Sequence, residues 1–307
     1  DCQDSMSGIH AIKNLLYYNL FKKAMNDLPI QSRGCYLQEN QGWEFGFISA
    51  WKAAGHKENL IGFAHASISY WDIRYFFDSR SYNPNGKNDL PLPDYFAVNG
   101  NAGKNMYLSG GFPKERLIEL ESLRYLYLHN YSSESKKMIV TSSKEKMVLI
   151  VTDFLEENTY KQLNLLLEAQ TEIDESIQYI VKPHPACPVN IINFPGLNAE
   201  VSTRPLEELM KQSDVIYSSS MTSASIDAYC AGLPIITFLD GNTLNVSPLR
   251  GYEGVYFVQN SEDLSSAINT IKVTGLVEKV NYFHLDPNLP KWSKWLTDDL
   301  EKIKIKS

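Results

Sequence analysis

Four short apolar runs in the C-terminal half decide the fold: MVLIVT at 147–152, QYIVK at 178–182, DVIY at 214–217 and LPIITF at 233–238. Each run is brief and rich in Val and Ile, which is typical of a strand buried on both faces of a parallel sheet. The segments between the runs have helical spacing, and Gly232 is a usual helix stop. We therefore predict alternating strands and helices, with a further strand at 254–258 and helices at 156–173, 205–212, 222–231 and 261–271.

The N-terminal half alternates less regularly. Its apolar runs predict strands at 34–38, 59–64 and 95–98, and helices at 9–24, 43–54 and 114–127. A polar stretch at 131–146, interrupted only by MIV at 138–140, indicates a linker that divides the chain.

These elements predict an α/β protein with two Rossmann-like domains that face each other across a cleft. Ligands are expected at the carboxyl ends of the parallel strands. The N-terminal domain is placed at 1–135 and is short enough to be incomplete. The C-terminal domain is placed at 145–290. A C-terminal helix, residues 291–307 with its helical pattern starting at 290, is expected to cross back.

The composition is that of an acidic globular protein. Of the 307 residues, 43% are hydrophobic, and the formal net charge is -7, which excludes a disordered chain and a basic nucleic-acid-binding protein. No apolar run approaches the ~20 residues that span a bilayer. No signal peptide is visible, although a chain that begins at Asp1 leaves room for upstream sequence.

The cysteines and the C-terminal tail bear on where the protein works. The four cysteines are scattered without a CxxC pair, so we expect reduced thiols in a cytoplasmic protein rather than a disulfide frame or a zinc site. The basic tail KIKIK at 302–306 allows peripheral contact with the inner membrane. A solvated helix end is the simpler interpretation of that tail.

The first candidate site is the run Lys182-Pro183-His184-Pro185, directly after a predicted strand. A proline on each side of the histidine fixes the backbone around it. An imidazole at the carboxyl end of a strand can donate to a phosphate or give a proton to a leaving group. The alternative is an ordinary solvated loop histidine.

The second candidate site is rich in hydroxyl groups and lies between a predicted strand and a predicted helix. It comprises Ser218, Ser219, Ser220, Thr222 and Ser223. One hydroxyl is needed to cap the helix in any case, but five within six residues exceed that need. Hydroxyls and free N–H groups at a helix start can hold a phosphate. Asp227, further along the helix, is placed to reach a ribose hydroxyl, and a capped Ser-rich turn remains the alternative.

The two candidate loops belong to successive strand–loop–helix units, so we expect them at one edge of one sheet. A histidine and several hydroxyls there suit the phosphate of a nucleotide leaving group, whose charge grows as the glycosidic bond breaks. No Walker or GxGxxG motif occurs, which disfavours ATPases and dehydrogenases. No Asp-x-Asp motif occurs either, so no metal and no cofactor are implied beyond the donor substrate.

The N-terminal half offers carboxylates and a basic pair. Glu39 and Glu44 stand at the end of a predicted strand and suit acid–base or nucleophilic work on a sugar. After the next strand, His65, Asp72 and Arg74 are interleaved with aromatic residues, and a bidentate arginine suits the carboxylate of an acidic sugar. A glutamate at a helix start also simply complements the helix dipole.

The pairing of Lys182-Pro183-His184-Pro185 with Ser218-Ser219-Ser220 resembles the HP and serine motifs of bacterial GT-B glycosyltransferases that use CMP-sugars. These include sialyltransferases, Kdo transferases of capsule and lipopolysaccharide assembly, and pseudaminic-acid transferases. The resemblance implies that His184 and the serines bind the phosphate of CMP. It also implies transfer of a nonulosonic acid to a surface glycan, with a nucleotide sugar and a glycan acceptor as partners.

One motif departs from that resemblance. The acidic pair followed by glycine of the sialyltransferases is absent, and Glu39, Glu44 or Asp72 is expected to replace it. Three alternatives stay open: a GT-B transferase that uses a UDP-sugar or CDP-glycerol, a non-catalytic glycan-binding or scaffold protein, and a sugar-nucleotide epimerase.

Overall fold

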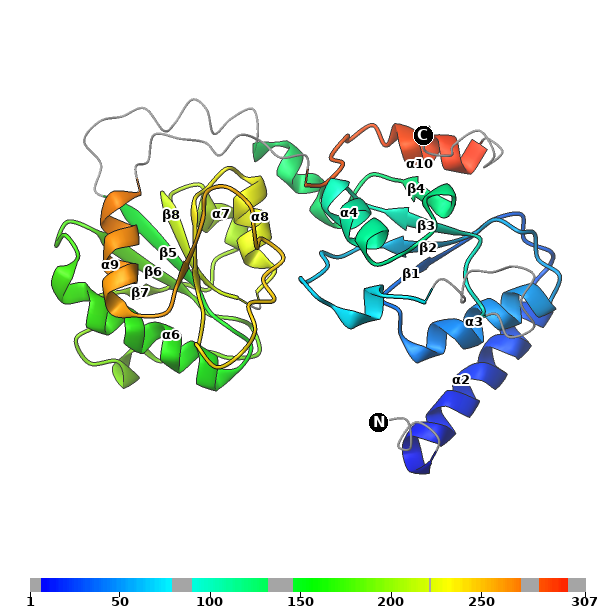
Figure 1. The fold of residues 1–307 in the computed structure, drawn as a ribbon, viewed down its shortest axis with the longest axis horizontal. Coiled ribbons are helices and arrows are strands. Elements are labelled where there is room, and N and C mark those ends of the chain that lie inside the picture. The colour runs from blue at the N-terminus through cyan, green and yellow to red at the C-terminus, as the bar shows by residue number, and fades with distance from the viewer. Residues whose placement is uncertain (1–6, 79–89, 132–145, 221, 272–281, 298–307) are drawn as a thin grey trace. The chain divides into compact units, whose positions relative to one another are not determined.

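The chain consists of two α/β units, each built on its own parallel sheet (Figure 1). The computed structural model describes residues 7–78, 90–131, 146–220, 222–271 and 282–297. Unit 1 comprises residues 1–126 and 281–307, and unit 2 comprises residues 127–280. The α/β class with two parallel-sheet domains, predicted from the sequence, is confirmed. Most of the predicted linker, residues 132–145, lies outside the described residues.

The sheet of unit 2 has six parallel strands in the order β10-β9-β8-β5-β6-β7. Every strand predicted in this half is present, and one short strand was missed: β7. The strands are β5 (Met147–Val151), β6 (Gln178–Lys182), β7 (Glu200–Val201), β8 (Val215–Ser219), β9 (Ile235–Phe238) and β10 (Val255–Val258). The helices are α6 (Glu156–Ala169), α7 (Leu206–Met210), α8 (Ala224–Cys230) and α9 (Ser261–Thr270).

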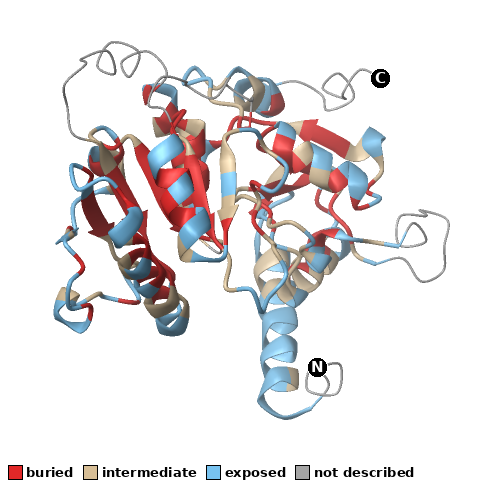
Figure 2. Cartoon of the chain, turned by 60° about the vertical axis from the view of Figure 1, so that its left-hand side comes forward, coloured by how far each residue is buried: buried red, intermediate tan, exposed pale blue. Residues whose placement is uncertain are grey.

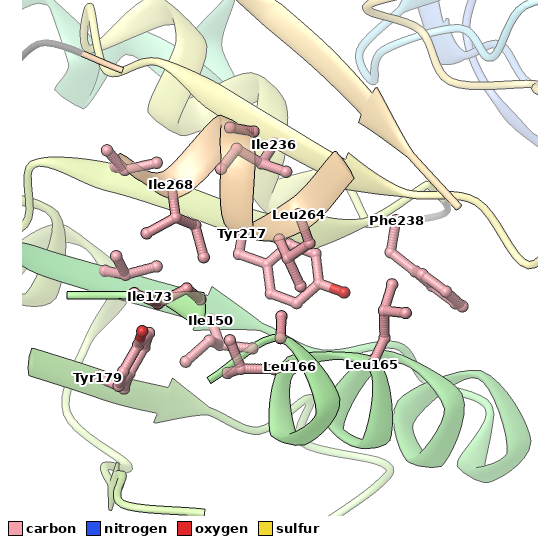
Figure 3. Packing of buried hydrophobic residues seen from close by; sticks show 14 of the residues in the cluster. Ile150, Leu165, Leu166, Ile173, Tyr179, Tyr217, Ile236, Phe238, Leu264 and Ile268 are labelled. Carbon is pink, nitrogen blue, oxygen red and sulfur yellow. The ribbon is translucent and has the colours of Figure 1, made fainter. Parts of the chain in front are cut away.

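One large hydrophobic core holds α6 and α9 against this sheet (Figure 3). Tyr217 on β8 and Ile150 on β5 point to the same face, and Leu166 of α6 packs on them. All three side chains are inaccessible to solvent. Alternate strand residues point to the opposite face, where α8 contacts β8 and β9. A sheet covered on both faces needs the continuous apolar strands found in the sequence.

The sheet of unit 1 has four parallel strands in the sequential order β1-β2-β3-β4. They are β1 (Gly34–Leu37), β2 (Leu60–Ala64), β3 (Tyr95–Val98) and β4 (Leu117–Glu119). On one face the aromatic side chains of Phe96, Tyr107 and Phe112 pack together, with Tyr107 supplied by α4 (Asn101–Ser109). This helix was missed in the sequence because its Asn and Gly residues hide the apolar stripe.

Two helices precede and follow β1, namely α2 (Gly8–Asp27) and α3 (Gly42–Ala53). Phe21 of α2 packs on Trp43 and Phe47 of α3, with ring centroids 6.0 and 5.4 Å apart. No residue of α2 is buried, and Figure 2 shows the helix pale blue along most of its length. Within the described part of the chain, α2 is held mainly by α3, and its Met25 also packs on the cluster of Tyr36, Ile48, Trp51 and Leu60.

The last described helix, α10 (Pro290–Thr297), belongs to unit 1 although unit 2 precedes it in the chain. Trp295 and Trp292 pack against Ile61 and Ile118 on the sheet face opposite α4. The buried Glu121 carboxylate accepts the backbone N–H groups of Lys291 (2.9 Å) and Trp292 (3.0 Å). The chain therefore crosses back to its first unit, as the sequence predicts, and residues 298–307 lie outside the described part.

The helix predicted at 114–127 is wrong. The structure has a 3-10 turn at Lys114–Arg116, strand β4, and a 3-10 helix at Leu123–His129. Leucines at 117, 120, 123 and 126 recur every three residues and so imitate a helical stripe. In the structure, Leu117, Ile118 and Leu120 are all fully buried, because this segment supplies the fourth strand of the sheet.

None of the helices in the described residues is both long and apolar enough to cross a membrane. The basic tail at 302–306 lies outside those residues.

Candidate functional site

The candidate site of unit 2 lies where the strand order reverses. From β5 the chain adds β6 and β7 on one side, then returns to place β8 on the other side of β5. Such a switch point opens a crevice at the carboxyl ends of the two diverging strands, where ligands of open α/β sheets bind. Val151 at the end of β5 pairs with Lys182 on one flank and with Ser218 on the other. Both predicted loops therefore leave the same sheet edge, about 10 Å apart at their strand ends, because neighbouring strands are about 4.8 Å apart.

The histidine loop is held by its own backbone and by β5. The N–H of His184 donates to Thr152 Oγ1 (3.1 Å), and its carbonyl accepts the N–H of Cys187 (2.9 Å). The Nδ1 atom of the His184 ring accepts the N–H of Ala186 at 3.1 Å. The proton of the neutral ring is therefore on Nε2, which can donate to a ligand. The ring is half-buried, edge-on to Phe154, with 6.2 Å between centroids.

Two further predicted residues flank this histidine. Lys182 ends β6 and is half-buried, and its carbonyl accepts the N–H of Thr152 at 3.3 Å. Pro185 is exposed. Their contribution to the loop is mainly geometric, since the proline restricts the backbone beside His184.

The serine loop is held by a buried carboxylate that sequence reasoning missed. Asp153, 1% exposed, directly follows β5 and accepts the hydroxyl proton of Ser219. The same carboxylate accepts the N–H of Leu155 (2.9 Å) and the side-chain amide of Asn158 (3.3 Å). The hydroxyl of Ser219 is therefore directed toward Asp153. The available signal was a carboxylate placed immediately after a central buried strand.

The remaining hydroxyls differ in what they can do. Ser218 Oγ is fully buried and finds no hydrogen-bond partner among the described residues, which is uncommon for a buried polar group. Ser220 is half-buried and Ser223 is exposed. Thr222 Oγ1 accepts the N–H of Ala224 at 3.3 Å, so it caps the turn into α8.

The helix after this loop begins at Ala224, two residues later than predicted, and has only seven residues. A helix this short has a weak dipole. The groups that this edge could offer an anion are therefore hydroxyls, backbone N–H groups and His184, and the helix dipole adds little.

In unit 1, the structure gives Glu44 a structural role. Its buried carboxylate accepts the N–H groups of Glu39 (2.8 Å) and Gln41 (2.9 Å), which completes a capping box at the start of α3. Burial raises the pKa of Glu44, and the two N–H groups oppose that shift. The carboxylate is thus engaged in holding the end of β1 to α3.

Glu39 and His65 come together at the carboxyl edge of this sheet. His65 Nε2 lies 3.7 Å from Glu39 Oε1, and the Glu39 side chain is 48% exposed. Burial lowers the pKa of His65, and the neighbouring Glu39 carboxylate works against this shift. His65 Nδ1 is buried without a hydrogen-bond partner among the described residues. An exposed carboxylate beside an imidazole can take a proton from a hydroxyl group.

Asp72 and Arg74 pair with each other. The guanidinium donates twice to the carboxylate, through Nη2 (2.6 Å) and Nε (2.9 Å). The Asp72 carboxylate also accepts the N–H of Arg74 at 3.1 Å. The two side chains therefore stabilise their own turn, and Arg74 must leave Asp72 or share it to hold a ligand carboxylate.

Within the described residues, no group of three His, Cys, Asp or Glu side chains is placed as a metal site requires.

No protein-family model matches the chain, and no curated protein matches it. Solved structures do share its fold. S. aureus MnaA, in a co-structure with UDP, aligns over 96% of this chain and 81% of its own at 11% identity, with a TM-score of 0.55. UDP-GlcNAc 2-epimerase from Neisseria meningitidis, bound to UDP-GlcNAc, aligns over 83% and 71% at 14% identity, with a TM-score of 0.52. The chain therefore has a GT-B-type fold, with two parallel-sheet α/β units.

Proposed function

We propose that the chain is an enzyme that binds a nucleotide sugar through unit 2 and transfers a nonulosonic acid from a CMP-sugar to a bacterial surface glycan. One observation carries this proposal. Thr152 and Asp153, at the end of β5, hold the His184 loop on one side and Ser219 on the other, at the switch point of the sheet.

The chemistry follows from these groups. In the transfer, the bond between the anomeric carbon and the phosphate oxygen breaks, and the acceptor oxygen bonds to that carbon. CMP leaves with the bonding electrons, so negative charge grows on its phosphate. His184 Nε2–H and the half-buried hydroxyl of Ser220 donate to those oxygens, and donors already in place stabilise the charge without reorganisation.

The sequence offers Glu39, Glu44 and Asp72 as the base that takes the proton of the acceptor hydroxyl. Glu39 suits that role best, since its side chain is half-exposed and lies 3.7 Å from the His65 imidazole. Asp72 is engaged with Arg74, and Glu44 caps a helix. If the reaction retains configuration, Glu39 would act as nucleophile instead.

A UDP-sugar is the second candidate donor. It is favoured by the solved structures of the same fold that contain UDP or UDP-GlcNAc. The hydroxyl groups of the serine loop suit phosphate or ribose oxygens, which CMP-sugars and UDP-sugars share. This candidate includes both transfer and epimerisation of the sugar.

A thermal-shift panel of CMP, CDP, UMP and UDP tests the proposal. A ligand that binds only the folded state at 100 times its Kd stabilises it by about 2.7 kcal/mol. We expect CMP or CDP to raise the Tm. A rise with UDP alone would transfer the assignment to a UDP-sugar enzyme. No rise with any nucleotide would contradict the enzyme proposal and favour a glycan-binding protein.

Matched variants locate the binding in this panel. His184→Ala and Ser220→Ala should abolish most of the CMP-induced shift. His10→Ala, on exposed α2, and Ser213→Ala, a buried serine before β8 at the opposite sheet edge, should keep it. An equal loss in both pairs would show that the variants act through general destabilisation.

A further inference from the structure

A phenyl ring is exposed at the switch point of unit 2, in the turn that follows β5. Phe154 is 47% exposed, although Thr152 and Asp153 directly before it are 0% and 1% exposed. The ring does not belong to the hydrophobic core that holds α6 and α9 on the sheet. The turn leaves the sheet between the His184 loop and the serine loop, because β5 lies between β6 and β8. Core packing therefore does not account for this side chain.

Hydrogen bonds fix the turn that carries the ring. The Asp153 carboxylate accepts the N–H of Leu155 (2.9 Å) and the side-chain amide of Asn158 (3.3 Å). The carbonyl of Asp153 accepts the hydroxyl of Thr159 (3.1 Å). The backbone on both sides of Phe154 is held in this way. The turn is thus in place before a ligand arrives, and little of its freedom is lost on binding.

The phenyl ring and the His184 imidazole are neighbours. Their centroids lie 6.2 Å apart, and their planes are inclined by 62°. The two rings therefore meet in a T-shaped arrangement, and the imidazole does not stack flat on the phenyl ring. A ligand that carries both a flat ring and a phosphate can touch Phe154 with the first and His184 with the second.

The charges beside the ring decide which part of a nucleotide it can meet. The acidic residues Glu156 and Glu157 follow directly in the chain, are exposed and form the first turn of α6. Carboxylates repel a phosphate at this end of the turn but do not repel an uncharged base. The phosphate is therefore expected on the side of His184 and Ser220, and the base on the side of Phe154.

We infer that Phe154 is the residue on which the pyrimidine base of the bound nucleotide stacks. The inference rests on the proposed function for the presence of a nucleotide in unit 2. Every base has a π face, so stacking on an aromatic side chain tolerates cytosine and uracil alike. Phe154 thus anchors the base without selecting it.

An apolar surface of another macromolecule is the other partner that an exposed phenyl ring can have. Leu155, next to the ring, is also 47% exposed. An apolar surface would cover both side chains, whereas a base needs only the aromatic one. The pair Phe154 and Leu155 therefore offers a matched comparison within one turn.

The experiment measures the binding of CMP and of ribose 5-phosphate, which lacks the base, by isothermal titration calorimetry. It compares wild type with Phe154→Ala, Phe154→Trp and the control Leu155→Ala. Phe154→Ala should weaken CMP binding about tenfold or more, as loss of a base-stacking ring does. Phe154→Trp keeps an aromatic face and should bind CMP as wild type does or more tightly. Leu155→Ala should leave CMP binding unchanged.

Ribose 5-phosphate separates stacking from an effect through the histidine. Because the phenyl ring also contacts His184, its loss could disturb the phosphate contact instead. We expect Phe154→Ala to bind ribose 5-phosphate as wild type does. An equal loss for both ligands would assign the effect to His184 and overturn the stacking. A loss of CMP binding in Leu155→Ala as large as that in Phe154→Ala would overturn it too.

The same titrations, repeated with UMP and UDP, separate this inference from the proposed function. Binding of UMP or UDP but not CMP, with a tenfold loss in Phe154→Ala, would uphold the stacking and overturn the CMP-sugar donor. CMP binding that is indifferent to Phe154→Ala would overturn the stacking and leave the proposed function standing. Wild type that binds none of the nucleotides would overturn both.

Discussion

The two sheets of this chain end their strands in different ways. In unit 2 the strand order reverses beside β5, and polar residues gather at that point. In unit 1 the order is sequential, and the polar residues at the strand ends mostly hold secondary structure. Glu44 caps α3, Glu121 caps α10, and Asp72 closes its own turn.

This difference shows how topology decides what a polar side chain can do. A reversal leaves a crevice in which donors can remain available to a ligand. A sequential sheet offers no such crevice, so a buried carboxylate there must find its donors in the protein. His184, half-buried with Nε2–H free to donate once Nδ1 accepts the Ala186 N–H, and Glu121, buried with two N–H donors, represent the two cases.

The cores of the two units differ as well, and the largest expected effect tests this difference. Among the described residues, the face of the unit 2 sheet that α6 and α9 cover has one extensive cluster of buried residues, whereas the clusters of unit 1 are smaller. Leu166→Ala opens a cavity in the former and should lower the free energy of unfolding by about 2–5 kcal/mol. Urea denaturation measures the loss. Leu244→Ala, at a 75% exposed position in unit 2, is the control and should change little.

Glu121→Ala tests the capping role of carboxylates in unit 1. The variant leaves the N–H groups of Lys291 and Trp292 without their acceptor, which should cost about 1–3 kcal/mol. Glu121→Gln keeps one acceptor oxygen and should lose less. Hydrogen exchange at the start of α10 reports the effect directly. Unchanged protection there in Glu121→Ala would show that packing of Trp295 alone holds the helix.

The pH dependence of unit 1 should depend on Glu119. The His284 imidazole, with Nε2 3.2 Å from the carboxylate, and hydrogen bonds from Lys104 and Lys291 hold the pKa of this carboxyl well below its ordinary value. A depressed folded-state pKa contributes stability above the unfolded value, near 4.3, and that contribution is lost as pH falls below it. We expect the Tm to decline below about pH 4.3, and the decline to be shallower in Glu119→Gln. The same acid slope in both proteins would assign it to other groups.

Thr152→Val gives the smallest expected change in stability. It removes the acceptor of the His184 N–H and should cost about 0.5–1.5 kcal/mol. It should also weaken CMP binding, since the histidine loop loses its link to β5. Thr237→Val on the neighbouring strand β9 is a matched control, because this buried hydroxyl has no partner among the described residues. Equal effects of the two substitutions on CMP binding would remove Thr152 from the site.

The strands of unit 2 could be predicted from the sequence because each is a continuous apolar run. Because strands and helices alternate in the sequence, the His184 and Ser218 loops could also be predicted to lie at the same edge of the sheet. The switch point could not be predicted, since the order of parallel strands is a long-range property that no local pattern carries. Asp153 was missed for the same reason, because a single aspartate after a strand gains meaning only when β8 is known to lie beside it.

In unit 1 the sequence signals were weaker. Leu117 to Leu126 imitated a helix, and α4 was hidden by Asn and Gly. From their residue types, Glu39, Glu44 and Asp72 are equally good candidates for a catalytic carboxylate. The hydrogen bonds of the structure distinguish them: Glu44 caps a helix, Asp72 is bonded to Arg74, and Glu39 is left exposed. The positive φ of Trp71 has no sequence signal, because bulky residues there are exceptional.

A crystal structure of the protein soaked with CMP tests the central claim most directly. We predict phosphate density at the carboxyl end of β5, within hydrogen-bonding distance of His184 Nε2 and of the serine loop at 218–220. Well-ordered CMP bound at any other place, or an empty edge at saturating CMP, would contradict the account.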